Sequence, residues 1–276
     1  MMDHANIRIC VAGATGWAGS ALVKAVLASN EFILTGAIAR QSVGEDIGTR
    51  LGGKPAGIRI EASLDGALSA PVDVLVDYTG PDSVKARTQE ALSRGLRVVI
   101  GTSGLTAEDY KDIERQATER NLGVIAAGNF SVTAALAKHF ALFAAPHVAS
   151  WEIIEYAHAD KPDAPSGTAR ELAEELARVA KNHIHRPIDQ TYRNIEARGT
   201  VVAGTPIHSV RLPGFVISFE TILGLPDERL TIRHDSGSSA QPYVAGTLLA
   251  VREVMQIKGL VRGLDRLLFR SVSDRS

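Results

Sequence analysis

The sequence predicts an α/β protein, a Rossmann doubly wound parallel sheet joined to a smaller α+β domain with a mixed sheet. Up to residue 129, short apolar, β-branched runs alternate with segments of helical periodicity. A glycine-rich turn joins the first of these runs to the first helical segment. Beyond residue 129 the pattern changes to strands in series with few helices, which favours a mixed or antiparallel sheet.

The first domain is expected over residues 1–130, with a return of the chain at 240–276. Buried parallel strands read as short apolar runs, and helices show a period near 3.6 residues. On these criteria strands are expected at 7–12, 32–39, 72–78, 97–100 and 123–127. Helices are expected at 20–28, 82–94, 107–119 and, after the second domain, 242–255.

The second domain, residues 131–239, is expected to bind substrate and mediate oligomerisation. Ser131 is a typical N-cap residue for an apolar helix that runs to about residue 144. A strand at 152–156 precedes a helix at 169–180. Further strands are expected at 207–212, 215–223 and 229–234.

Composition excludes several classes of protein. The 276 residues carry a net charge of -1 and only 5% aromatic residues, which argues against a nucleic-acid partner. A lone cysteine, Cys10, allows no internal disulfide and fits a reducing, cytoplasmic compartment. No run of 18 apolar residues occurs, so no membrane span is expected.

The turn after the first strand has the spacing of a phosphate cradle. Gly13, Gly16 and Gly19 form G-x-x-G-x-x-G between a strand and a helix. Glycines let the backbone approach a pyrophosphate, and the helix amino terminus offers free N–H donors. We therefore expect Gly13, Thr15, Gly16 and Trp17 to bind a dinucleotide. The alternative is a tight βα turn without a ligand.

The end of the second strand indicates the cofactor. An acid here usually holds the ribose of NAD, whereas an arginine suits the 2′-phosphate of NADP. This sequence has no acid at that place and continues with Arg40 and Ser42. We expect NADPH, with NADH possible, unless Arg40 is simply a solvated loop charge.

Two further loops follow expected strands. In an open α/β sheet, ligands bind beyond the carboxyl ends of the strands. Tyr78 and Thr79 follow one strand, and Gly101, Thr102 and Ser103 follow the next. We expect these residues near the nicotinamide and its ribose, with ordinary turn chemistry as the alternative.

The segment 158–168 is a candidate anion site. Lys161 precedes two prolines, and Ser166, Gly167 and Thr168 lead into an amphipathic helix. The helix terminus, its free N–H groups and the ammonium of Lys161 would hold a substrate carboxylate. His158 could transfer a proton near neutral pH. The alternative is a proline-rich linker with a routine helix cap.

The run 161–168, Lys-Pro-Asp-Ala-Pro-Ser-Gly-Thr, resembles the K-x-D-A-P-S-G-T signature of the dihydrodipicolinate reductase family. Further matches are 11–16, 76–79, 100–104, 129–131 and 230–234. The resemblance implies a Rossmann domain, a four-stranded substrate domain that builds a homotetramer, and hydride transfer to a cyclic imine dicarboxylate of lysine synthesis. It also implies that Lys161, Gly167 and Thr168 bind substrate carboxylates. By the same resemblance, Asn129 and Phe130 are expected beside the cofactor.

The sequence departs from the family pattern at four positions. Ala157 stands where the family has the first of two histidines, which leaves His158, Lys161, Asp160 or a water as the proton donor. Thr133 and Ala135 replace a glycine and an asparagine, and Ser218 replaces a histidine. The polar groups that face the substrate are therefore expected to be fewer than in the family.

These departures leave three functions open. The first is reduction of 4-hydroxy-tetrahydrodipicolinate with His158 and Lys161 as catalytic residues. The second is reduction of another imine or enamine carboxylate by a divergent paralogue, and the third is a non-catalytic NADPH sensor. A dehydrogenase that depends on a nucleophilic cysteine is disfavoured, because Cys10 lies within a strand. His183 and His185 lack a third ligand, so no metal site is expected. A homotetramer or homodimer is expected.

Overall fold

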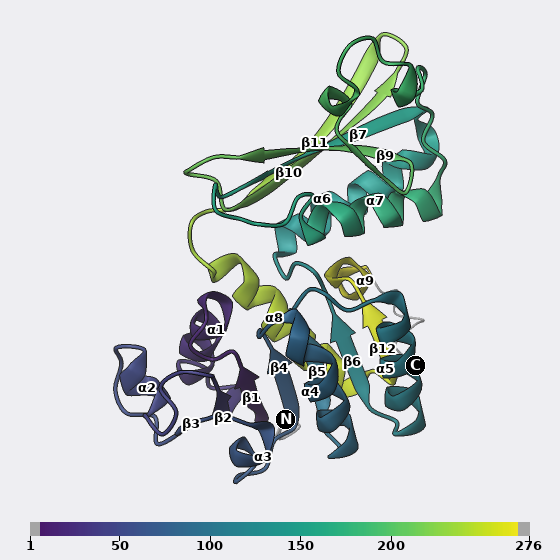
Figure 1. The fold of residues 1–276 in the computed structure, drawn as a ribbon. Helices are drawn as coiled ribbons and strands as arrows, with labels where there is room; N and C mark the ends of the chain where they lie inside the picture. The colour runs from purple at the N-terminus through teal and green to yellow at the C-terminus, as the bar shows by residue number, and fades with distance from the viewer. Residues whose placement is uncertain (1–5, 270–276) are drawn as a thin grey trace. The chain divides into compact units, whose positions relative to one another are not determined.

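A computed structural model describes residues 6–269. The chain divides into two compact units (Figure 1). One unit contains the chain up to Val132 and again from Ala240, and the other spans Thr133–Ser239. The return of the chain after residue 240 therefore adds to the amino-terminal unit.

The first unit is built on a seven-stranded sheet in which every pair of neighbouring strands is parallel. The spatial order is β12-β6-β5-β4-β1-β2-β3. The order reverses between β1 and β4, which is the ligand-binding switch point of doubly wound sheets. The strands are β1 (Ile7–Ala12), β2 (Phe32–Ile38), β3 (Ile60–Glu61), β4 (Val74–Asp77), β5 (Arg97–Ile100), β6 (Gly123–Ala126) and β12 (Gly259–Arg262).

Helices cover this sheet on both faces. A buried apolar cluster joins α4 and α5 to the strands, with Leu92 and Ile113 from the helices and Leu75 and Val98 from the sheet. On the other side α1 lies beside α8 (Figure 1). The helices are α1 (Trp17–Leu27), α2 (Ile47–Arg50), α3 (Leu64–Ala67), α4 (Pro81–Ser93), α5 (Ala107–Glu119), α8 (Gln241–Glu253) and α9 (Leu264–Leu268).

The second unit contains a mixed five-stranded sheet in the order β11-β10-β7-β9-β8. Only β7 and β9 pair in parallel, and the other neighbours are antiparallel. The expected number of strands was four, and the difference is the edge strand β8, which is joined to β9 by a turn at Ala203 and Gly204. The strands are β7 (Ser150–Ala157), β8 (Thr200–Val202), β9 (Thr205–Arg211), β10 (Ile217–Leu225) and β11 (Glu228–Asp235).

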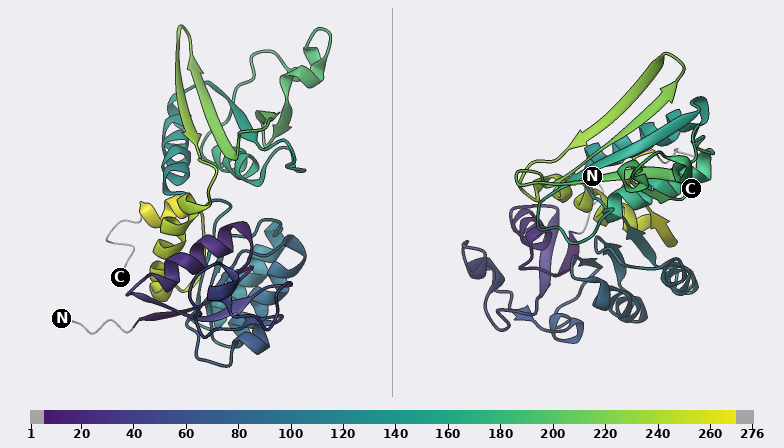
Figure 2. Two further views of the ribbon diagram at one scale, coloured as in Figure 1. Left: turned by 90° about the vertical axis from the view of Figure 1, so that its left-hand side faces the viewer. Right: turned by 45° about the horizontal axis from the view of Figure 1, so that its top comes forward.

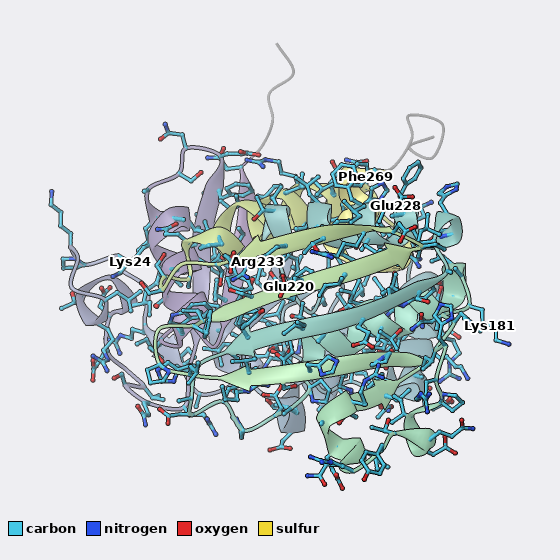
Figure 3. All side chains as sticks on the ribbon, turned by 90° about the horizontal axis from the view of Figure 1, so that it is seen from above. Lys24, Lys181, Glu220, Glu228, Arg233 and Phe269 are labelled. Carbon is cyan, nitrogen blue, oxygen red and sulfur yellow. The ribbon has the colours of Figure 1, made fainter. Side chains whose placement is uncertain are left out.

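The helices α6 (Val132–Ala144) and α7 (Gly167–Val179) cover one face of this second sheet (Figure 1). Residues of β7 alternate between buried and half-buried, with Trp151 and Ile153 in the helix-covered core. Figures 2 and 3 show the opposite face of the sheet, which no helix of the described part of this unit covers. That face carries Tyr156, Glu220 and Arg233.

The predicted fold class is confirmed, and the bounds of β1, β5 and α5 agree with the expected ranges. The sequence did not predict six short elements: α2, β3, α3, β8, β12 and α9. Each of these has five residues or fewer, too few to show a period in the sequence. No helix in residues 6–269 is long and apolar enough to cross a membrane.

Candidate cofactor and substrate sites

The glycine-rich turn places the backbone of β1 against the neighbouring loop. Gly13 has a φ of +80°, and a Cβ there would lie 2.3 Å from the carbonyl oxygen of Tyr78. A Cβ on Gly19 would lie 2.1 Å from the carbonyl oxygen of Gly13. Gly16 caps α1 without a side chain. The first N–H groups of α1 therefore face outward beside a backbone that side chains do not obstruct.

The side chain of Trp17 flanks this turn. It is 49% exposed, and its ring meets the ring of Tyr243 edge-on, with centroids 5.4 Å apart. Thr15 lies within the turn and is half-buried. The expected cofactor residues 13–17 thus form one contiguous surface at the amino end of α1.

Arg40 is exposed just beyond the end of β2. A second guanidinium reaches the same segment from α2, because Arg50 donates from Nε to the Ser42 hydroxyl over 2.8 Å. Glu45 lies 3.8 Å from this Arg50 nitrogen. The sequence pattern missed Arg50, since only the folding of the short helix α2 brings it to Ser42.

Asp77 organises the loops that follow β4 and β5. Its buried carboxylate accepts hydrogen bonds from the Thr79 amide (2.9 Å), the Thr79 hydroxyl (2.6 Å) and the Thr102 hydroxyl (2.9 Å). Arg87 of α4 donates to the same carboxylate at 3.0 Å. Thr79 and Thr102 therefore use their hydroxyls to fix the loops, and Ser103 lies exposed beside them. Asp77 and Arg87 were not among the predicted residues.

Tyr78 and Phe130, two of the expected cofactor residues, direct their side chains into the interior of the first unit. The Tyr78 hydroxyl shares a 2.5 Å hydrogen bond with Thr247, and burial raises the pKa of this phenol. Phe130 is 1% exposed and packs edge-on against the Tyr78 ring. A Cβ on Gly101 would lie 2.1 Å from that ring. The Phe130 side chain therefore belongs to the core, and the expectation that this residue lies beside the cofactor stays a prediction.

Asn129 offers an uncommitted donor at the carboxyl end of the parallel sheet, after β6. Its side-chain oxygen accepts from the Ser131 amide at 2.8 Å. Its Nδ2 is buried and has no hydrogen-bond partner within residues 6–269. A buried amide donor without a partner is costly, which favours a ligand acceptor at this position.

In the second unit, the segment 158–168 leaves β7 and enters α7. His158 is 56% exposed, and its Nδ1 accepts from the Asp160 amide at 3.3 Å. Lys161 is hydrogen-bonded to the Asp163 carboxylate. Burial acts to raise the pKa of Asp163, but the hydrogen bond and charge of Lys161, together with the nearby Arg211 charge and a backbone hydrogen bond, shift this pKa downward overall. Lys161 therefore already holds one carboxylate.

The start of α7 provides backbone donors. Ser166 is the N-cap, and its hydroxyl accepts from the Ala169 amide at 3.3 Å. Ser166 is 4% exposed and its hydroxyl is engaged in this cap, so its expected role in substrate binding stays a prediction. Gly167 and Thr168 are the first residues of the helix, and their amides have no partners inside it.

The four departures from the family pattern lie in different surroundings. Ala157 is 1% exposed on the helix-covered face of the sheet. Ser218 pairs with Tyr156 and Asp235 on the opposite face of the sheet. The expectation that fewer polar groups face the substrate stays a prediction. Thr133 is exposed and Ala135 buried at the start of α6.

Two other kinds of chemistry find no support. Burial raises the pKa of the Cys10 thiol to about 12, which is unsuitable for a nucleophile. Within residues 6–269, no group of three or more histidine, cysteine, aspartate and glutamate side chains could hold a metal ion.

Comparisons with known proteins cover nearly the whole chain. The family "Dihydrodipicolinate reductase, N-terminus" matches residues 7–130, and "Dihydrodipicolinate reductase, C-terminus" matches residues 129–268. The 4-hydroxy-tetrahydrodipicolinate reductase of Moorella thermoacetica is 40% identical over 266 residues, which is 96% of this chain and 98% of that protein. The enzyme of that name from Synechococcus elongatus is 38% identical over 95% of this chain and 98% of its own length.

Solved structures agree with this result. A dipicolinate-bound dihydrodipicolinate reductase from Paenisporosarcina sp. TG-14 has a TM-score of 0.79 and 33% identity, and the match covers 95% of this chain and 99% of that one. An amine dehydrogenase from Mycobacterium smegmatis, with 16% identity over 96% of this chain and 97% of its own, shares the fold with a TM-score of 0.66. The predicted NAD(P)H-dependent oxidoreductase is confirmed, and the chain belongs to the dihydrodipicolinate reductase family.

Proposed function

We propose that this chain reduces 4-hydroxy-tetrahydrodipicolinate, the compound for which its relatives are named. One observation carries the assignment to this substrate class: the short segment 161–168 contains both the Lys161 ammonium and the first amides of α7, which have no partners within the helix. Such an arrangement binds carboxylates. The first unit would bind the nicotinamide cofactor and the second the substrate.

The residues of the first unit fit a dinucleotide. The space beside Gly13 and Gly19 admits no side chain, and the amides of α1 beyond it suit a pyrophosphate. Arg40, with Arg50 beside Ser42, would hold a 2′-phosphate, which supports a preference for NADPH over NADH. Asn129 would donate its unpartnered amide to the bound cofactor. When bound, the reduced nicotinamide supplies the hydride.

Lys161 would exchange one carboxylate for another when substrate binds. In the ligand-free chain its ammonium is paired with Asp163. A substrate carboxylate would take over this ammonium and accept from the Gly167 and Thr168 amides as well. The electrostatic clamp would hold the imine carbon in line for the hydride, which is how positioning contributes to the rate.

His158 or a water would supply the proton. Its imidazole is exposed and lies next to Asp160, so it can exchange protons with solvent. Ala157, in place of the family histidine, favours the second candidate function, reduction of a different imine or enamine carboxylate.

The uncovered face of the second sheet supports self-association as a homotetramer or homodimer. Figure 3 shows this face with Glu220 and Arg233, whose charged groups lie 3.9 Å apart. Ile154, Ile222 and Tyr156 are half-buried on the same face. This face therefore carries both apolar and charged side chains, and its apolar side chains would gain stability when a second copy covers them. We also propose a cytoplasmic location, where the reduced cofactor is available.

Replacing Lys161 by alanine tests the carboxylate clamp. We expect kcat/KM for the imine substrate to fall by about 10- to 100-fold, the worth of one charged hydrogen bond. The dissociation constant for NADPH, measured by fluorescence, should not change. Lys181→Ala, an exposed lysine beyond α7, is the matched control. An unchanged kcat/KM in Lys161→Ala would contradict the proposed clamp.

A further inference from the structure

A buried ion pair lies beneath the segment 158–168 and has no part in the chemistry described above. Glu155 of β7 is 2% exposed, and the Arg211 side chain at the end of β9 is 17% exposed. Arg211 donates from Nη2 to Glu155 Oε1 over 2.6 Å. Both residues lie on neighbouring parallel strands, where Ala157 and Arg211 are in register.

The Glu155–Arg211 pair is hydrogen-bonded to the segment 158–168 at two points. Glu155 Oε1 also accepts from the Ser166 amide, at 3.3 Å. Arg211 Nη2 also donates to the carbonyl oxygen of Asp163, at 2.7 Å. The stretch 163–166 is therefore fastened at both ends to one carboxylate–guanidinium pair. A second Arg211 nitrogen, Nη1, donates to the Val210 carbonyl at 2.9 Å, which fixes the fork itself.

The two residues held by the ion pair, Asp163 and Ser166, each adjoin one part of the proposed anion site. The carboxylate of Asp163 is the partner of the Lys161 ammonium, and Ser166 caps the helix that begins with the amides of Gly167 and Thr168. The ammonium and the helix amides come from opposite ends of a short loop, so their separation depends on how that loop is held. A carboxylate bound by both groups requires a fixed separation.

We propose that Glu155 and Arg211 are positioning residues that set the distance between the Lys161 ammonium and the first amides of α7. The inference rests on the proposed substrate site, but the tether itself is a property of the ligand-free chain. Lysine cannot replace Arg211, because one ammonium does not reproduce the planar fork that reaches Glu155, Asp163 and Val210 together. The tether acts on substrate binding through the loop and touches neither substrate nor cofactor.

The test compares Arg211→Lys with Arg8→Lys, which makes the same change in the Arg8–Asp73 pair of the other unit. Hydrogen exchange of the segment 158–168 is measured without ligand, followed by KM, kcat and the inhibition constant of dipicolinate. In Arg211→Lys we expect faster exchange at Ser166 and at least a 10-fold rise in KM and in the dipicolinate constant. We expect kcat to change less and the NADPH dissociation constant to stay as in the unaltered protein.

An unchanged rate of hydrogen exchange at the Ser166 amide in Arg211→Lys would contradict the proposal that this ion pair holds the loop. An equal loss of NADPH and dipicolinate binding would also contradict it, because it would show general damage to the fold. If Arg211→Lys does not fold, Glu155→Gln serves in its place, because its amide oxygen still accepts from Ser166 while the charge is lost. It should loosen the loop and raise KM by a smaller factor. A chain that reduces no imine would contradict the proposed function, yet loop exchange would still decide the tether.

Discussion

Arg40 is the residue on which the choice of cofactor depends. It lies exposed beyond β2, its guanidinium forms no hydrogen bond or ion pair with residues 6–269, and it follows a strand end that carries no acid. Arg50 reaches the same segment but shares its charge with Glu45. Arg40 is therefore the freer of the two cations for a phosphate.

Arg40→Ala should raise the KM for NADPH by about 10- to 100-fold, because a charged hydrogen bond to phosphate is lost. The KM for NADH, which lacks this phosphate, should stay unchanged. Steady-state kinetics with both cofactors checks the result, with Arg115→Ala on the exposed surface of α5 as the control. Equal effects on both cofactors would show that Arg40 does not read the 2′-phosphate.

The sequence suggested the residues that we propose to bind ligands, but it did not suggest the residues that hold them in place. Lys161 and the glycines of 13–19 belong to short sequence patterns, so sequence alone could single them out as candidate binding residues. Asp77, Glu155 and Arg211 act through partners more than ten residues away or on other strands, and no local pattern marks them. Conversely, Phe130 matches the family motif but serves the core.

At the scale of elements, the β1–α1 turn is the most demanding part of the nucleotide site. A methyl group on Gly19 would meet the Gly13 carbonyl at 2.1 Å, so the turn would have to open. Gly19→Ala should weaken NADPH binding by at least about 10-fold and lower the melting temperature. Gly224→Ala in β10, where a Cβ meets nothing within 4 Å, should leave NADPH binding unchanged. Isothermal calorimetry of both variants decides this.

The start of α5 predicts a pH dependence of stability. Lys85 and the Thr106 amide and hydroxyl lower the pKa of Asp109 to about 2. In the unfolded chain an aspartate titrates near a pKa of about 3.9. Because folding lowers the pKa, the ionised carboxylate stabilises the folded state above about pH 4, and this contribution is lost as the pH falls towards 2.

Asp109→Asn should therefore reduce the free energy of unfolding at pH 7 and make little difference near pH 2. Urea denaturation at both values checks this, with Asp82→Asn in the first turn of α4 as the control. A deficit of the same size at both pH values would contradict the electrostatic origin of the effect.

The long elements could be predicted because their periods extend over several turns or their apolar runs are uninterrupted. The elements of the segment 40–71 could not be predicted. The short helices α2 and α3 and the strand β3 lie there among glycines and charged residues, without a periodic pattern. These pieces gain their order from contacts with the rest of the unit: β3 pairs with β2, and Leu64 and Ala67 of α3 belong to the buried core cluster. Tertiary contacts override weak local preference in such stretches.

At the scale of the whole molecule, we propose that each of the two units contributes one binding site. The dinucleotide would bind at the glycine-rich turn and Asn129 of the first unit, and the substrate carboxylate at the segment 158–168 of the second, which the Glu155–Arg211 ion pair holds. Full-length similarity to 4-hydroxy-tetrahydrodipicolinate reductases places both units in one family. Within this arrangement the chain departs from the family pattern at Ala157, Thr133, Ala135 and Ser218.

The most direct test is NADPH oxidation by the purified full chain with enzymatically generated 4-hydroxy-tetrahydrodipicolinate, beside a panel of other cyclic imine carboxylates. We predict turnover on the first compound, with inhibition by dipicolinate that competes with the imine. Turnover confined to another imine acid would contradict the substrate assignment and attribute the new specificity to Ala157 and its neighbours. Tight NADPH binding without turnover on any compound would contradict the enzymatic function itself.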